Sequence, residues 1–355
     1  MTHGAAQPIL QRARELGFAL AGVTPASPTD HDDALRAWLR DGRHGEMTWL
    51  AEHADVRADP RRLVQEQGEI RSLILVADQY ASRDDPRETA SPGVGRIARY
   101  ARGDDYHRVM KKRLQTLADA LREVHPGHVF RCFVDTAPVL EREHAARAGL
   151  GWVGKHTLLI HPRLGSYLFL GGIATSLELT PPAEQSPMED HCGTCTRCID
   201  ACPTDAITPY AVDATRCISY LTIEHRSPID AQFHAAMGDW VYGCDICQEV
   251  CPHNSARSDG IDTGHAHEAY QPRRTSFDLL EVLGWTKEDR REAFRRSAMK
   301  RAKLDMMRRN AVIAAGNDGG KQLFSRVEEI ASDDAEPELV RQTARDVLER
   351  RNQAG

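Results

Sequence analysis

The chain has 355 residues, of which 41% are hydrophobic, and its formal net charge is −6. This length allows roughly two or three domains, and the negative charge argues against indiscriminate polyanion binding but not against a local basic patch. Because the N-terminus lacks a secretory signal and no run of roughly 20 apolar residues would span a bilayer, we expect a cytoplasmic protein with no membrane contact.

Residues 1–180 predict one domain of the α/β or α+β class, in which strands alternate with helices. Helical spacing marks 9–16, 106–124 and 139–148. Short apolar runs predict strands at 18–23, 72–77, 129–134, 158–160 and 167–170. A run rich in Pro and acidic residues at 180–190 predicts the boundary of this domain.

A cysteine-rich module is expected over 181–260, and the sequence beyond it turns helical. Helical spacing recurs at 277–283, 298–315, 322–331 and 337–350, with a turn at Asp333 and Asp334. We predict an all-α domain of HEAT-type repeats over 275–355. Two helical hairpins are fewer than a solenoid needs to be stable alone, so this domain should pack against the rest of the chain.

Eight of the nine cysteines lie between residues 192 and 251. The first four follow C-x2-C-x2-C-x3-C and precede Pro203, the bacterial ferredoxin run in which the fourth thiolate crosses to a second 4Fe-4S cluster. The first predicted cluster takes Cys192, Cys195, Cys198 and Cys251. The second takes Cys202, Cys217, Cys244 and Cys247.

Zinc is the alternative to these clusters, because paired C-x2-C motifs also form tetrahedral zinc sites. The three-cysteine run fits two such sites poorly, and disulfides are rare in a reducing cytosol. The ninth cysteine, Cys132, is interpreted as a buried apolar thiol unless it faces a cofactor.

Residues 149–155 satisfy both G-x-G-x-x-G and G-x-x-x-x-G-K, two nucleotide-binding patterns. A phosphate loop needs Ser or Thr after Lys155, where His156 stands. A dinucleotide loop follows a strand and opens a helix, whereas this motif follows a predicted helix. We interpret the glycines as letting the backbone approach a large flat group such as a cofactor ring.

Asp135 follows a predicted strand and precedes a predicted helix. Open α/β sheets bind ligands at the carboxyl ends of strands. Burial under an apolar cofactor would raise the pKa of this carboxyl and suit it to general acid catalysis. The alternative is that Asp135 is the N-cap of the following helix.

Several segments resemble epoxyqueuosine reductases, and the resemblance covers nearly the whole chain. They are residues 100–101, 103–107, 134–142, 149–157, 217–224 and 243–248. The resemblance implies an enzyme that depends on cobalamin and iron-sulfur clusters and reduces epoxyqueuosine to queuosine at wobble position 34 of tRNA, the last step of queuosine biosynthesis. Reductive dehalogenases share this cofactor layout, but the absent export signal and the basic C-terminal helices count against that activity.

By position, the resemblance implies that Asp135 is the proton donor and that residues 1–180 form the cobalamin-binding catalytic domain. The implied cobalamin contacts are Arg57, Asp135, Lys155, Thr157, Leu158, Ser219 and Asp245. The sequence has no Asp-x-His-x-x-Gly run, which fits a base-off cobalamin without a histidine ligand from the protein.

Positive charge for tRNA is concentrated at 287–309, where ten Lys and Arg residues face four Asp and Glu residues, a difference of +6. We predict that this helical segment contacts phosphates, and the alternative is a solvated surface with internal ion pairs. The candidate tRNA contacts are Tyr220, Arg295, Arg296, Lys300, Arg301, Lys303, Arg308 and Arg309. A splayed base would stack on Tyr220 or Trp240.

The expected partners are the anticodon loop of a GUN-type tRNA and an external low-potential electron donor such as flavodoxin or ferredoxin, with the chain as a monomer. Two other classes compete with the enzyme. A plain electron carrier would hold iron and sulfide without cobalt, and an RNA-binding scaffold would bind tRNA without turnover.

Overall fold

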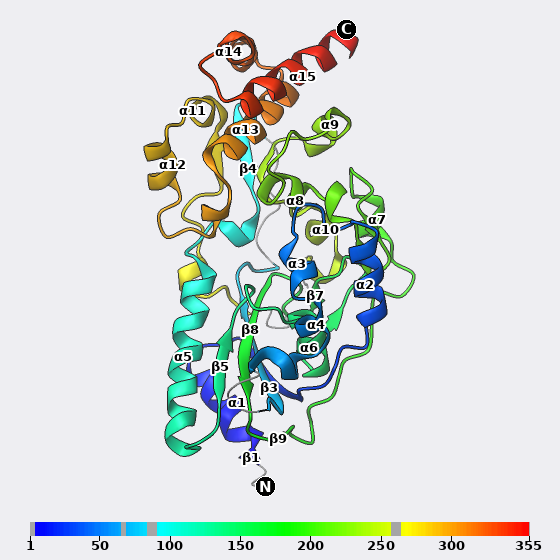
Figure 1. Cartoon of the computed structure of the whole chain (residues 1–355), viewed down its shortest axis with the longest axis vertical. Helices are drawn as coiled ribbons and strands as arrows, with labels where there is room; N and C mark the ends of the chain where they lie inside the picture. The colour runs from blue at the N-terminus through cyan, green and yellow to red at the C-terminus, as the bar shows by residue number, and fades with distance from the viewer. Residues whose placement is uncertain (1–3, 65–68, 84–90, 257–263, 355) are drawn as a thin grey trace.

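The computed structural model describes residues 4–64, 69–83, 91–256 and 264–354. The molecule is elongated, with the N-terminus at one end and the last helices at the other (Figure 1). The predicted end of the cysteine module, residue 260, lies outside the described residues.

A four-stranded sheet forms the centre of the N-terminal part, in the order β2-β3-β8-β5. These strands are β2 (Leu20–Pro25), β3 (Ser72–Gln79), β8 (Leu168–Thr175) and β5 (Phe130–Phe133). All three neighbouring pairs are antiparallel, so the domain is of the α+β class and a parallel α/β sheet is excluded for these strands. Because β3 and β5 both run against β8, their carboxyl ends lie on the same side of the sheet.

Helices cover both faces of this sheet, which explains the continuous apolar run of β3. Ile74 and Val76 pack with α1 (Ala6–Glu15) and α5 (Tyr106–Val124). Leu73, Leu75 and Ala77 pack on the other face with α6 (Glu141–Arg147) and η1 (Pro60–Val64). Successive strand residues point to opposite faces, so a strand buried on both sides is apolar throughout. The predicted helix 106–124 coincides with α5.

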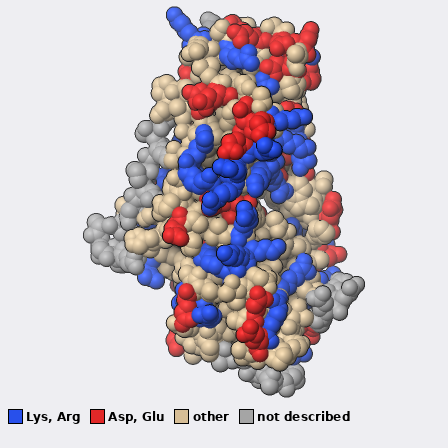
Figure 2. Space-filling model, turned by 90° about the vertical axis from the view of Figure 1, so that its left-hand side faces the viewer, with Lys and Arg blue, Asp and Glu red and all other residues tan. Residues whose placement is uncertain are grey.

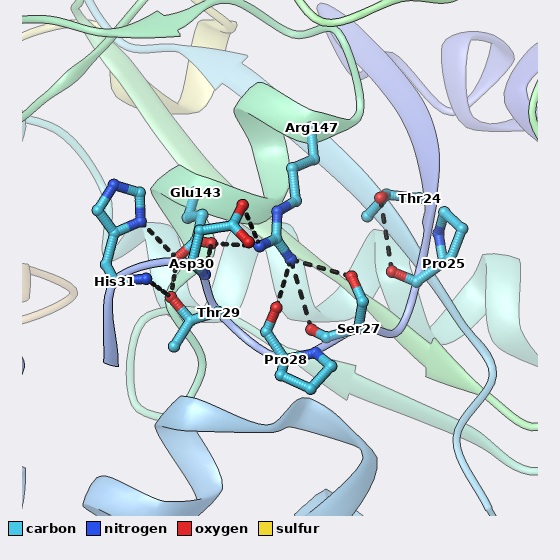
Figure 3. A network of polar contacts seen from close by, with 9 residues as sticks. All are labelled: Thr24, Pro25, Ser27, Pro28, Thr29, Asp30, His31, Glu143 and Arg147. Atoms are coloured by element: carbon cyan, nitrogen blue, oxygen red, sulfur yellow. Dashed lines mark hydrogen bonds and ion pairs between the residues drawn. The ribbon is translucent and has the colours of Figure 1, made fainter. Parts of the chain in front are cut away.

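α6 is anchored by two of its own side chains (Figure 3). The Arg147 guanidinium donates to the carbonyls of Ser27 and Pro28 and pairs with Asp30 at 2.8 Å. Glu143 pairs with Arg147 at 2.6 Å and accepts a 2.9 Å hydrogen bond from the Asp30 amide. These contacts fix α6 to the loop that follows β2, and thereby fix the position at which α6 begins.

A second sheet has the order β12-β4-β13 and joins distant parts of the chain. Its strands are β12 (Trp240–Tyr242), β4 (Val94–Ile97) and β13 (Ser276–Asp278). The predicted helix 277–283 is wrong at its start, because Phe277 pairs with Gly95 in the sheet and α11 (Leu279–Leu283) begins only after Asp278. The Asp278 side chain caps α11 by accepting from the Glu281 amide.

Four further helices form the C-terminal end: α12 (Lys287–Ala293), α13 (Leu304–Asp318), α14 (Lys321–Ser332) and α15 (Glu338–Ala354). The predicted helix 298–315 is broken into the 3-10 turn η7 (Ala298–Arg301) and α13. Arg290 fixes this break by donating to the carbonyls of Lys300 and Ala302. Buried residues of α13, α14 and α15 share one hydrophobic core with α8 (Ile218–Ile223) and β12. The HEAT classification stays a prediction.

The cysteine module contains short elements only. Besides α8 and β12, they are α7 (Arg197–Asp200), β10 (Ile207–Thr208), β11 (Ala211–Val212), η3 (Ala214–Arg216), η4 (Ala231–Phe233), α9 (His234–Met237), α10 (Ile246–Glu249) and η5 (Pro252–Asn254). The remaining elements are β1 (Gly4–Ala5), α2 (Asp32–Arg40), α3 (Trp49–Glu52), α4 (Ala54–Ala58), η2 (Arg99–Ala101), β6 (Trp152–Val153), β7 (Leu159–Ile160), β9 (Leu179–Thr180) and η6 (Glu268–Tyr270). Among the described residues, no helix combines the length and apolarity needed to cross a membrane.

Candidate active site

The loop between β5 and α6 carries Asp135, the expected acid. Its φ is 54°, in the left-handed region that residues other than glycine rarely adopt and that is often found at functional sites. The Asp135 amide donates a 2.6 Å hydrogen bond to Oε1 of Glu141, the first residue of α6. The N-cap of α6 is Leu140, so the alternative in which Asp135 caps this helix is wrong.

His107 in the first turn of α5 joins two carboxylates. Its Nε2 lies 3.2 Å from Oδ2 of Asp135, and its Nδ1 lies 2.8 Å from Oδ1 of Asp105. Asp105 is also the N-cap of α5, where it accepts from the His107 amide. Two carboxylates from separate segments are therefore joined in one polar chain from Asp105 to Asp135.

The hydrogen bonds in this polar chain shift the pKa values of its members. Burial by itself would raise the pKa of Asp135, but hydrogen bonds from His107 and Tyr106 outweigh burial and the pKa is lowered. Burial lowers the pKa of His107, yet the hydrogen bonds with Asp105 and Asp135 raise it to about 9. In the chain alone the contacts with His107 lower the pKa of Asp135, whereas the predicted rise concerned Asp135 beneath a bound cofactor and stays a prediction.

Arg57 and Glu141 complete the surroundings of Asp135. Burial lowers the pKa of Arg57, while the charges of Glu141 and Asp135 act in the opposite direction, which places all three groups within electrostatic reach. Burial and the charge of Asp135 raise the pKa of Glu141 to about 8. The Nε atom of Arg57 is buried without a hydrogen-bond partner in the described part of the chain. Such an orphaned donor is a suitable contact for a bound polar group.

The glycine loop is a hairpin of β6 and β7. It follows α6 and opens no helix, so neither nucleotide-binding pattern has its structural context. The interpretation that its glycines leave room for a cofactor ring is wrong for Gly149 and Gly151. A Cβ at Gly149 would lie 2.7 Å from the Ser186 carbonyl oxygen, and one at Gly151 would lie 2.2 Å from that of Ile160. The chain's own backbone fills this space.

Three predicted cofactor contacts lie in the turn of this hairpin. Lys155 uses its ammonium group on the carbonyls of Gly193 and Cys195, at 2.6 and 3.0 Å, so it ties the hairpin to the cysteine module. Thr157 accepts from Arg142 of α6 at its carbonyl and its hydroxyl, at 2.6 and 3.0 Å. Leu158 is half-buried. Because Arg142 directly follows Glu141, the turn is connected to the acid loop.

The last two predicted cofactor contacts come from the module itself. Asp245 is buried and accepts a 2.7 Å hydrogen bond from the Arg99 amide. Burial raises its pKa to about 6. Ser219 lies half-buried on α8, the helix that Cys217 precedes directly. Both residues therefore stand beside cysteines of the second predicted set.

The electrostatic contacts among the eight thiols mostly follow the two predicted sets, and the contact of Cys198 with Cys247 crosses between them. The thiols of Cys192, Cys195 and Cys198 act electrostatically on Cys251 and line a cavity of about 40 Å³ with it. Cys217, Cys198 and Cys202 act in the same way on Cys247, so Cys198 of the first set also reaches the second, and Cys217 and Cys247 act on Cys244. Burial raises the pKa of Cys251 to about 11 and also raises the pKa values of Cys244 and Cys247.

Two further observations bear on the sequence alternatives. In the described ranges, no three His, Cys, Asp or Glu side chains gather closely enough to hold one metal ion, which does not separate zinc from iron-sulfur clusters. Cys132 lies half-buried on β5 with Sγ 3.9 Å from Oε1 of Gln115 on α5, and burial raises its pKa to about 11. It contacts α5, as expected for a structural thiol.

Sequence comparisons find relatives along most of the chain. An epoxyqueuosine reductase from Leadbetterella byssophila is 41% identical over 299 residues, which are 84% of this chain and 94% of the relative. One from Escherichia coli is 39% identical over 317 residues, 88% of this chain and 81% of the relative. The chain belongs to the epoxyqueuosine reductase family. It is therefore an oxidoreductase.

Family models and solved structures agree with this assignment. The model "Epoxyqueuosine reductase QueG, DUF1730" matches residues 57–136, and "4Fe-4S double cluster binding domain" matches 191–254. The epoxyqueuosine reductase of Streptococcus thermophilus has a TM-score of 0.81 and 30% identity, covering 95% of this chain and 88% of its own. Another solved reductase, with an epoxyqueuosine-modified tRNA stem loop, has a TM-score of 0.82 at 29% identity and the same coverage.

Four residues that the sequence assigned to tRNA lie inside this reductase. Tyr220 is buried and its hydroxyl accepts from the Glu46 amide at 2.7 Å, and Trp240 is buried in β12. Arg308 pairs with Glu336 at 2.6 Å. Arg309 donates to backbone carbonyls of Leu221, His225 and Ser227. These assignments are corrected to structural roles, because α13 turns both arginines into the core.

The other five candidate tRNA contacts are exposed: Arg295, Arg296, Lys300, Arg301 and Lys303. Arg296 pairs with Asp104, and Arg301 pairs with Glu224 at 2.5 Å. Lys300 and Lys303 have no ion pair within the described residues. Figure 2 shows that Lys and Arg gather at mid-height on the face that carries α12 and α5.

Sequence reasoning missed His107, Glu141 and Arg142 as parts of the site. The signal for His107 was its place two residues after an Asp that starts a helix, since N-capping fixes the Asp and the ring together. Glu141 and Arg142 open the helix after the acid loop, where side chains point back to the preceding turn.

Proposed function

We propose that this reductase converts epoxyqueuosine to queuosine at position 34 of tRNA, using cobalamin and two 4Fe-4S clusters, with Asp135 as the proton donor. The observation that carries the proposal is the contact between the Asp135 carboxylate and the ring of His107, on a loop fastened to α6 by Glu141. A solved relative with an epoxyqueuosine-modified tRNA stem loop supports the substrate, and another relative has its catalytic Asp loop swung out of the active site.

The residues around Asp135 fit a large polar cofactor such as cobalamin. Arg57 offers a buried N–H without a partner among the described residues, and Thr157 and Leu158 lie in a turn that Arg142 joins to the acid loop. Asp245 and Ser219 would contact the cofactor on the side of the site nearest the thiols. Lys155 donates to the carbonyls of Gly193 and Cys195, so it would affect the cofactor site indirectly, by positioning the loop that carries Cys192 and Cys195. When bound, cobalamin supplies a cobalt centre that is reduced one electron at a time and becomes a strong reductant.

The two sets of thiols fit two cubane clusters. The first set is Cys192, Cys195, Cys198 and Cys251, and the second is Cys202, Cys217, Cys244 and Cys247. Because burial keeps the free thiols protonated, cluster assembly would release protons and make the module's fold depend on iron.

The chemistry assigns a defined task to each side chain. Removal of the epoxide oxygen takes two electrons and two protons and releases water. Asp135 would protonate the oxygen as the carbon–oxygen bond breaks, which contributes about 10² to 10⁴ in rate for a well-placed donor. Glu141 would hold the loop, and Arg57 would balance the negative charge of Asp135.

The exposed basic residues would bind the phosphates of the anticodon stem loop. The proposed phosphate-binding surface consists of eight exposed residues. They are Arg295, Arg296, Lys300, Arg301 and Lys303, together with Arg108, Lys111 and Lys112 on α5. Arg301 acts electrostatically on Asp135, so this surface reaches the acid loop. The same proposal includes a GUN-type tRNA as substrate and an external low-potential electron donor such as flavodoxin or ferredoxin. It also includes a monomeric state and a cytoplasmic location.

The test is anaerobic reconstitution of the full chain with iron, sulfide and cobalamin. We expect two clusters and one cobalamin per chain, a cob(II)alamin EPR signal, and conversion of epoxyqueuosine in a tRNA stem loop, followed by mass spectrometry of the nucleosides. Iron without cobalt would favour a plain electron carrier. Stem-loop binding without conversion, at full cofactor occupancy, would favour an RNA-binding scaffold, and either result overturns the proposal.

A further inference from the structure

The ring of His107 lies between two carboxylates. Both nitrogens are within hydrogen-bond distance of an oxygen, 2.8 Å to Asp105 and 3.2 Å to Asp135. A neutral imidazole carries a single N–H, so it can satisfy only one of these contacts. Two satisfied contacts require one extra proton, either on the ring or on one of the carboxyl groups.

We propose that His107 holds this extra proton and passes it to Asp135, so that the two side chains act as one acid in the proposed reaction. The inference rests on the proposed function for its substrate, but the shared proton is a property of the chain itself. His107 acts through Asp135 and is a positioning residue that also relays a proton.

The surroundings keep the ring in place for this transfer. His107 stacks on Tyr106 with ring centroids 4.0 Å apart, and Tyr106 stacks on Phe169 of β8 at 4.1 Å and 5°. Asp105 is fixed as the N-cap of α5. Neither nitrogen can leave its carboxylate without breaking this stack, so the proton moves along a short path of defined direction.

The transfer conserves protons at each step. The N–H bond at Nε2 of His107 breaks and an O–H bond forms at Oδ2 of Asp135, which then gives its proton to the substrate oxygen. His107 is left neutral with its hydrogen on Nδ1, where it still donates to Asp105. The imidazole side chain is 32% exposed and can take up a new proton from water. Two rounds supply the two protons of the reduction, while the electrons come from the external donor.

Other charged groups act on the two carboxylates that flank the ring. Lys300 acts on Asp105, while Arg301 and Tyr106 act on Asp135. Glu141 and Tyr242 act on Tyr106. The direct partners of His107 remain Asp105 and Asp135, which both raise its pKa.

A direct test is to titrate His107 by NMR in the full chain, with histidine labelled and the clusters present. The titration is run with and without cobalamin. The signal is assigned by its loss in His107→Gln. We expect titration near pH 9 in the wild type and a shift toward the ordinary value of 6.5 in Asp135→Asn. Titration near 6.5 in the wild type, or no response to Asp135→Asn, would overturn the shared proton whatever the substrate is.

The second readout is single-turnover reduction as a function of pH. Glutamine can donate a hydrogen bond but cannot release a proton, so His107→Gln should slow conversion about 100-fold while stem-loop binding and cofactor content stay unchanged. His125→Gln, at the other end of α5, is the matched control. Wild-type rates for His107→Gln across the pH range would contradict the relay. If the wild type itself forms no queuosine, the proposed function fails and the NMR result still decides the inference.

Discussion

The cysteine module and the acid site are assembled in opposite ways. The eight thiols lie between residues 192 and 251, with spacings that reveal their chemistry in the sequence itself. The acid site takes Arg57 from α4, His107 from α5, Asp135 from a loop and Glu141 from α6. A sequence motif specifies the cysteine module. The acid site exists only because the fold around the antiparallel sheet brings four segments together. The predictions below test this contrast.

The largest effect is expected from Cys251→Ser, which removes the proposed ligand that crosses back to the first cluster. Iron should fall from about eight to about four atoms per chain, and turnover should be lost, because electrons no longer reach the site. Iron analysis and the stem-loop assay measure both. Cys132→Ser, outside the module, should keep its iron. Full iron content in Cys251→Ser would disprove the assigned ligand sets.

Removal of a buried arginine tests the corrected structural role of α13. Arg309→Met leaves the carbonyls of Leu221, His225 and Ser227 without their donor and should lower the free energy of unfolding by about 3 kcal/mol. Thermal unfolding of the apoprotein measures this change. Lys303→Met, an exposed control on the same segment, should change stability little. Equal stability of both variants would contradict the role of Arg309 in the core.

Loss of exposed charge should affect tRNA instead of the fold. Lys300→Ala with Lys303→Ala should weaken stem-loop binding and make the slope of log K against log salt shallower by about 1 for each lysine that contacts a phosphate. Binding measured at several salt concentrations gives the slope. Lys321→Ala on α14 is the control. An unchanged slope in the double variant would remove this surface from the interface.

The smallest effect is a pH dependence of stability. The folded-state pKa of His107, about 9, lies above its ordinary value of 6.5. The protonated ring therefore stabilises the fold fully below pH 6.5, and this contribution disappears as the pH rises through 9. The melting-temperature difference between wild type and His107→Gln should be constant at low pH and shrink between these values. A difference that grows with pH would have the wrong sign.

The sequence predicted the structure well where contacts between neighbouring residues determine it. α5 matches its predicted bounds, because apolar residues recur on one face between Tyr106 and Leu121. It was a poor guide at Phe277, where pairing with β4 overrides helical spacing, and at Arg309, whose charge indicated the surface. Tertiary contacts decide such positions, and a pattern along the chain does not contain them.

The same limit applies to the protonation state of Asp135. Its place after a strand was visible in the sequence, and its helix-capping alternative was equally compatible with the residues. The partner that decides its charge, His107, lies on another element and approaches through the fold of α5 against β5 and β8. Electrostatic partners of this kind are predictable only after the topology is known.

The central claim is that Asp135 is the acid of an epoxyqueuosine-reducing site. It is tested most directly by single-turnover conversion of an epoxyqueuosine stem loop by wild type and Asp135→Asn, both loaded with iron and cobalamin. We predict that the wild type releases a nucleoside lighter by one oxygen atom, and that Asp135→Asn is slower by about 10² to 10⁴ at equal cofactor content. Equal rates for the two proteins would contradict the account.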